Sequence, residues 1–317
     1  MAISKLGFRP LLVAACCALS WSACGDAPAG ADRAPSESAL DEALRLGDPL
    51  LRAERIARQL QELDAAGARA ALDAFERHAA HASAEDAAWF AIAAARVDPA
   101  RTLERVLRWP DRSLRERAAA EAVSEWARRD PGAAAAELRS RPDLDLRPAL
   151  VRGWAEADPD AALRFVAAQP AGRSRRQQVR ALVAVLRRRA PEAGLHWLEA
   201  LLARSDLPAP VRRELLAAGV SAAARSDPVG TAAWLGPRLD SAGATGAIAA
   251  LADAWGELDP PGAAAWLDSL PASAERDRAL HELFRAWSAR DPQEAQRWRR
   301  EAQRATGPRP LPGELSR

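Results

Sequence analysis

The stretch LADAWGELDPPGAAAW, residues 251–266, contains the pattern that decides the fold. Leu251 and Trp255 are four residues apart, so they lie on one face of a helix. The carboxylate of Asp259 is suited to accept the free amide hydrogens at the start of the next helix, and Pro260 is suited to its first position. A residue before proline is also disfavoured in the α region, so the first helix must stop there. One dipeptide therefore predicts the end of one helix and the beginning of the next.

Comparable prolines recur along the chain at a nearly constant interval. They are Pro99, Pro131, Pro159, Pro191, Pro228, Pro260 and Pro292, separated by 32, 28, 32, 37, 32 and 32 residues. A period near 32 residues, in units rich in helix-forming residues, is typical of stacked helical hairpins. We therefore predict an all-α fold, an α-solenoid of antiparallel helical hairpins with about seven repeats.

Two further positions follow the same period. The third residue after each proline is small: Thr102, Ala134, Ala162, Gly194, Thr231, Ala263 and Ala295. The sixth is an aromatic ring in five units: Phe165, Trp197, Trp234, Trp266 and Trp298. Small residues allow neighbouring helices to approach closely. We interpret the rings as core wedges between repeats rather than as a ligand-binding box, because they follow the repeat period.

Residues 84–305 resemble bacterial helical-repeat proteins built on the theme Trp-Ala-x-x-Asp-Pro-x-x-Ala-x-x-Trp. The first half of this theme reads WARRDP at residues 126–131 and WAEADP at residues 154–159. The stacking that the resemblance implies is similar to that of tetratricopeptide and HEAT arrays. The period and consensus depart from true tetratricopeptide repeats, so the resemblance implies neither a peptide-clamp groove nor an activity.

The N-terminal residues 1–23 have the pattern of an export signal. Lys5 and Arg9 precede an apolar stretch, residues 10–23, that is too short to span a bilayer. It ends in WSACG, which resembles the lipobox of bacterial lipoprotein signal peptides, with Trp21 where that family usually has Leu. The resemblance implies cleavage before Cys24 and lipidation of Cys24. An ordinary secretory signal and an uncleaved anchor are the alternatives.

The cysteines and the charge narrow the function further. The three cysteines are Cys16, Cys17 and Cys24, so a body that begins at Cys24 has no other thiol for catalysis or disulfides. The chain has 45 basic and 43 acidic residues, and residues 1–23 hold two of the basic ones and no acid. The mature body is therefore neutral, which does not favour nucleic acid as a partner. By the sorting rule of enteric bacteria, Gly25 favours the outer membrane, facing the periplasm, although Asp26 keeps the point open in other lineages.

We predict four segments. Residues 1–23 form the signal peptide, 24–37 the lipidated cysteine and a flexible tether, 38–305 the α-solenoid, and 306–317 a disordered tail. Within the solenoid, Asp48-Pro49 opens a helix 50 residues before Pro99, so the first helices are expected to form an atypical N-terminal cap.

Catalytic and metal-binding patterns are weak. His78, His81 and Glu85 have helical spacing, but Ser83 has the character of an N-cap, so we expect a helix break between them and histidines exposed at a helix end. The pair His281-Glu282 begins like a zinc-protease motif, but Arg285 stands where the second histidine is required. We predict a protein that is not an enzyme and has no cofactor or metal.

The strongest local anomaly is the arginine-rich stretch 173–189, which contains no acid. On a helix, Arg176, Arg180 and Arg187 fall within about 40° of one another. Such a stripe is suited to an acidic partner, anionic lipid head groups or a glycan phosphate. The alternative is a solvated face balanced by acids on adjacent helices.

These observations favour a lipid-anchored scaffold of the bacterial cell envelope that binds another envelope protein through its helical-repeat surface. The alternative is a non-catalytic accessory to peptidoglycan or glycan processing. A hydrolase hidden in the array is the third hypothesis.

Overall fold

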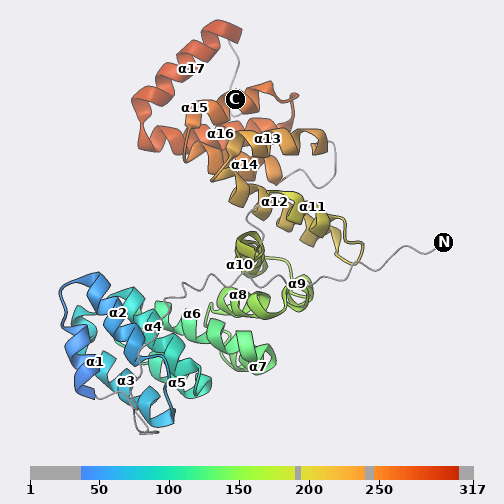
Figure 1. Ribbon diagram of the computed structural model, residues 1–317. Coiled ribbons are helices and arrows are strands. Elements are labelled where there is room, and N and C mark those ends of the chain that lie inside the picture. The colour runs from blue at the N-terminus through green and yellow to red at the C-terminus, as the bar shows by residue number, and fades with distance from the viewer. Residues whose placement is uncertain (1–36, 190–193, 240–245, 307–317) are drawn as a thin grey trace, which may run out of the picture. The chain divides into compact units, whose positions relative to one another are not determined.

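The computed structural model describes residues 37–189, 194–239 and 246–306, and every regular element in these ranges is a helix (Figure 1). The α-helices are α1 (Glu37–Leu44), α2 (Pro49–Gln59), α3 (Ala65–His78), α4 (Ala84–Ala95), α5 (Pro99–Val106), α6 (Arg112–Arg129), α7 (Pro131–Ser140), α8 (Arg147–Ala157), α9 (Pro159–Ala167), α10 (Arg173–Arg189), α11 (His196–Leu202), α12 (Ala209–Ala224), α13 (Pro228–Leu235), α14 (Ala247–Gly256), α15 (Pro260–Ser269), α16 (Ala274–Arg290) and α17 (Pro292–Thr306). Two short 3₁₀ helices, η1 (Ala79–His81) and η3 (Gly236–Arg238), complete the set. The predicted all-α class is confirmed.

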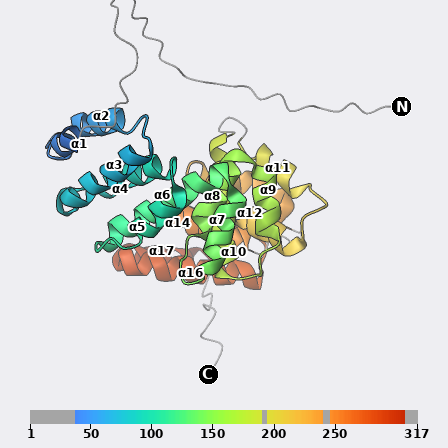
Figure 2. The ribbon, with the colours of Figure 1, turned by 90° about the horizontal axis from the view of Figure 1, so that it is seen from below.

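The helices from α4 onward form consecutive pairs. The even-numbered helices α4, α6, α8, α10, α12, α14 and α16 each pack against the next one, and we call them the even row. Most odd-numbered helices lie against the even helices before and after them, whereas α11 packs mainly on α12. Figure 2 shows α3, α4 and α6 side by side, which agrees with their direct packing. This arrangement is that of an α-solenoid of hairpins, with α1, α2 and α3 before the first pair.

The Asp-Pro steps act as predicted. Helices α5, α7, α9, α13, α15 and α17 each begin at the proline. The preceding aspartate accepts a hydrogen bond of 2.8 to 3.1 Å from the amide three residues further on, and these aspartates are Asp98, Asp130, Asp158, Asp227, Asp259 and Asp291. Each such cap contributes about 1 kcal/mol to stability. The helix starts at these Asp-Pro steps thus recur along the chain at the repeat period.

The unit that lacks the capping aspartate departs from the pattern. Pro191 lies outside the described residues, and α11 begins at His196. Gly194 has a φ of +53°, so it lies in a turn before the helix, and the prediction that it packs on a helix face is wrong. In the other six units the small residue is buried, at 3% exposure or less.

Three of the five periodic aromatic rings contact a ring on the other helix of their own hairpin. Trp154 of α8 contacts Phe165 of α9, with ring centroids 5.1 Å apart. The corresponding pairs Trp255–Trp266 and Trp287–Trp298 are 6.1 and 5.8 Å apart. The Trp234 indole instead donates to Glu199 of the preceding unit at 2.8 Å, so the periodic rings pack both within one hairpin and between repeats.

Arginine side chains also hold the even row together, which the sequence patterns did not suggest. Arg129, Arg189 and Arg290 stand directly before the proline step, and each donates to a backbone carbonyl at the C-terminal end of the preceding even helix. Those carbonyls have no partner within their own helix. A residue on one repeat therefore completes the helix of the repeat before it.

The even helices approach closely at Gly153 of α8. A Cβ atom added there would lie 1.9 Å from the backbone oxygen of Ser124 in α6. Glycine is required because the two backbones leave no room for a side chain. Within the described ranges, no helix combines the length and the apolar character that are needed to cross a bilayer.

Candidate functional site: an arginine-lined groove on the even row

A hollow of about 1040 Å³ follows three successive helices of the even row, α10, α12 and α14. Two contacts fix how α10 and α12 lie along it. Near the start of α10, Arg175 pairs with Glu214 of α12 at 2.9 Å, and near its end Arg187 donates to the carbonyl of Ala222 at 2.9 Å. The two helices therefore run parallel, and the hollow is a groove along their length. We call it the arginine groove.

Small side chains line much of the groove. Ala217, Ala218, Ser221 and Ala222 come from α12, which packs against both α10 and α14. Ala184 contributes a further small side chain from α10. The groove thus has α12 as its floor and α10 and α14 as its two walls.

The structure brings together all three arginines of the predicted stripe. Arg176, Arg180 and Arg187 all line the groove from α10. The floor adds two exposed arginines, Arg213 of α12 and Arg225, which directly follows that helix. Among the residues that the structure describes, none of these five side chains is ion-paired with a carboxylate. The groove consequently presents exposed cationic side chains to an anionic partner, and among them Arg187 already uses one nitrogen to donate to the carbonyl of Ala222.

Three other arginines of the same stretch have structural partners. Arg175 is only 7% exposed, and the hydrogen bond from Arg175 to Glu214 raises the pKa of this guanidinium. Arg188 donates to Glu156 of α8 at 3.0 Å, and Arg189 to a carbonyl of the same helix. The acid-free stretch therefore contains both arginines that join adjacent repeats and exposed arginines without an ion pair.

The opposite wall carries the opposite charge. Asp253 of α14 and Glu257, which directly follows that helix, line the groove, and both are exposed. Further along, Glu275 of α16 lies in a shallow hollow with Asp253, and burial raises the pKa of Glu275. The charge that lines the groove thus changes from positive on α10 to negative on the α14 side.

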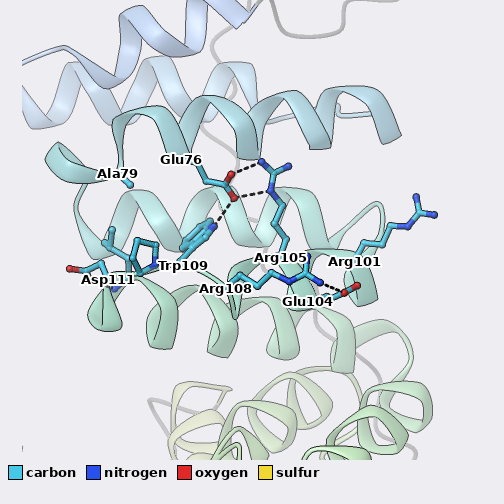
Figure 3. Close-up of a pocket in the computed structure, with 10 residues that line it drawn as sticks. Glu76, Ala79, Arg101, Glu104, Arg105, Arg108, Trp109 and Asp111 are labelled. Atoms are coloured by element: carbon cyan, nitrogen blue, oxygen red, sulfur yellow. Dashed lines mark hydrogen bonds and ion pairs between the residues drawn. The ribbon is translucent and has the colours of Figure 1, made fainter.

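A second hollow, of about 630 Å³, lies on α3, α5 and α6, and Figure 3 shows Arg105 and Trp109 both directed at Glu76. Arg105 donates to both oxygens of Glu76 at 2.7 Å, and the Trp109 indole donates to it at 2.8 Å. Burial raises the pKa of Glu76, but these hydrogen bonds outweigh burial and leave that pKa below its usual range. The other two arginines of this hollow, Arg101 and Arg108, also have carboxylate partners. The arginines of this hollow already form ion pairs with carboxylates of the protein itself, so we do not take it as the binding site.

The histidine candidates have other roles. Ser83 caps α4 in a capping box, which confirms the predicted break after His81. His78 is half-buried, not exposed as expected, and its Nε2 lies 3.0 Å from Asp41. No three His, Cys, Asp or Glu side chains of the described residues lie close enough to hold a metal ion. Arg285, which stands where a zinc-protease motif requires its second histidine, forms an ion pair with Glu282.

Cys24 lies outside the described residues.

Arg213 and Arg225 were not predicted from the sequence. Their signal is the local repeat interval, because the step from Pro191 to Pro228 is 37 residues. The same step from Arg176 leads to Arg213, and from Arg188 to Arg225. Comparing consecutive repeats at this offset would have found the second row of cations.

Comparison with protein families, with curated proteins and with solved structures gave no match to this chain. The geometry of the arginine groove therefore carries the functional argument.

Proposed function

We propose that this protein is a lipid-anchored scaffold of the bacterial cell envelope, and that it binds another envelope protein through the arginine groove. One observation carries the proposal: exposed arginines with no ion pair to a described carboxylate gather on adjacent repeats around a floor of small side chains. Complementary charge across such a surface raises the association rate and selects the partner. Helical arrays offer long surfaces of this kind for protein partners.

The attachment to the membrane is part of the proposal and rests on the lipobox resemblance around Cys24. Acyl chains on Cys24 would hold the helical array at the outer membrane, on its periplasmic side, through a short tether. Replacement of Cys24 by Ala is expected to abolish labelling with a fatty-acid analogue and to move the protein to the aqueous phase in detergent partitioning. Normal processing and unchanged membrane partitioning of Cys24→Ala would refute the anchor.

The binding role is tested by crosslinking in the cell that makes the protein. Native chain is compared with Arg176→Ala/Arg180→Ala/Arg187→Ala after detergent extraction and mass spectrometry. The control is Arg139→Ala/Arg297→Ala, which removes exposed arginines of α7 and α17 that make no ion pair with a described carboxylate. We expect one envelope protein to be recovered with the native chain and the control, and lost with the triple variant.

Two outcomes would count against this role. Equal recovery of the partner with all three chains would place the binding surface elsewhere. Failure to recover any partner, together with retention of the protein on isolated peptidoglycan, would favour the glycan-accessory role instead.

A further inference from the structure

We propose that the arginine groove receives an acidic segment of the partner in extended conformation, lying along α10 with acidic residues at alternate positions. This inference rests on the proposed scaffold function. It specifies what part of the partner enters the groove and in which pattern.

The spacing of the arginines indicates a linear ligand. A helix rises about 1.5 Å per residue, so Arg176 and Arg180 are about 6 Å apart along α10, and Arg187 lies about 10 Å beyond Arg180. A single phosphate or carboxylate group is best held by donors that converge on one point. Here the cations are distributed along the groove, which suits a chain that carries several separate charges.

An extended polypeptide matches this spacing. Its side chains on one face recur about every 6.6 Å, and three alternate residues span about 13 Å. That span is about 3 Å shorter than the one from Arg176 to Arg187 along a helix, a difference within the reach of flexible arginine side chains. Acidic residues at i, i+2 and i+4 would therefore each face one arginine of α10.

The opposite wall explains why the acids should alternate. The side chains between them point the other way, toward Asp253 and Glu257 on the α14 side of the groove. An acidic residue at such a position would meet like charge, which is unfavourable. Neutral or basic residues are therefore suited to these positions.

The test measures peptide binding to the full chain in detergent by fluorescence anisotropy. The probes have the sequences Ala-Glu-Ala-Glu-Ala-Glu-Ala, with alternating acids, and Ala-Ala-Glu-Glu-Glu-Ala-Ala, with the same acids in a block. A third probe replaces the alternating glutamates by lysines, and inorganic pyrophosphate is used as a competitor. We expect the alternating acidic peptide to bind several-fold more tightly than the block peptide and to lose affinity in 0.5 M salt.

Charge reversal provides the decisive variant. Arg176→Glu/Arg180→Glu is expected to weaken the acidic peptide at least about tenfold and to create binding of the lysine peptide. The matched control Arg139→Glu/Arg297→Glu should leave both affinities unchanged. Circular dichroism of each variant shows whether it is folded, and a gain of lysine-peptide binding supports the inference only in a folded variant.

The contrary results separate this inference from the scaffold itself. No peptide binding, with the crosslinked partner still lost in the triple alanine variant, would mean that a folded surface enters the groove, and only the inference would fall. Displacement by micromolar pyrophosphate, with no discrimination between peptides, would make the ligand a phosphate group and would overturn both proposals. Equal loss in the control variant would reduce the effect to non-specific attraction and would overturn the inference.

Discussion

Two stretches of the even row share the same helical architecture but differ in whether their charged side chains form ion pairs. On α4, α6 and α8, the carboxylate of Glu125 contacts Arg96, Arg128 and Arg129, and Glu121 pairs with Arg152 at 2.8 Å. Along α10 and α12, five exposed arginines of the groove have no ion pair to any described carboxylate, whereas Arg188 at its edge pairs with Glu156 of α8. We call the first region the paired stretch.

The difference shows where the surface is available for binding. In the paired stretch Glu125 is only 4% exposed, so its ion pairs replace the water that burial removed. In the arginine groove the cations keep their solvation until a partner displaces it. The same hairpin thus serves internal packing in one region and recognition in the other.

Gly153→Ala is expected to have the largest effect, because it disrupts the helix packing beneath the paired stretch. The new Cβ would overlap the backbone of Ser124, so α6 and α8 must separate, at a cost of about 3 kcal/mol of unfolding free energy. Urea unfolding followed by circular dichroism measures this loss.

Gly132→Ala is the control, because its added Cβ would meet nothing closer than 3.5 Å. It should be neutral or stabilise the protein by a few tenths of a kcal/mol. Equal loss in both variants would contradict the close approach of α6 and α8.

Glu125→Gln compares the two stretches directly. It removes a buried charge from three arginines, and we expect it to lower the unfolding free energy by about 2 kcal/mol, less than for a fully buried pair because the arginines are half exposed. Arg180→Gln in the groove should change the same quantity by less than about 0.5 kcal/mol. Similar losses of unfolding free energy in the two variants would contradict the distinction between the ion-paired residues of the paired stretch and the unpaired arginines of the groove.

Glu76→Gln tests the ion-pair cluster on α3 and α5 through its pH dependence. The pKa of Glu76 is lowered in the folded protein by Arg105 and Trp109, so the carboxylate stabilises the fold above its unfolded pKa of about 4.3 and loses this effect as the pH falls through the folded pKa. We expect the variant to be about 1 kcal/mol less stable at pH 7, since the site is partly solvated. The difference from the native chain should shrink on acidification, and a constant difference down to pH 3 would disprove the linkage.

Arg180→Glu should have the smallest effect and the opposite sign. Arg176 and Arg180 are like charges at i and i+4, and reversal of one makes them an attractive pair worth about 0.3 kcal/mol. Thermal unfolding at low salt should therefore show a slight gain in stability that disappears in 0.5 M salt. A clear loss would show that Arg180 already has a structural partner.

The sequence predicted the architecture well because the fold repeats. Each Asp-Pro step combines a cap and a helix start in adjacent residues, so six helix beginnings follow from local chemistry alone. The prediction failed at Gly194, where the capping aspartate is replaced by Ala190 and local chemistry no longer marks the helix start.

The candidate site was only half predictable. Arg176, Arg180 and Arg187 were found because they share one helix, and helical periodicity orders residues within a helix. Arg213 and Arg225 come from the next repeat, and the roles of Arg175 and Arg189 depend on atoms 39 and 34 residues away. Periodicity within one helix does not contain these contacts, so only the structure separates the arginines that hold repeats together from those that remain exposed.

The most direct test of the arginine groove as the binding face is site-specific photocrosslinking in the cell. A photoreactive residue is placed at Ala184 in the groove, or at Arg117 of α6 beside the paired stretch, and both positions are exposed. Our account predicts that the partner is captured from position 184 and not from position 117. Capture from position 117 alone, or equally from both, would contradict it.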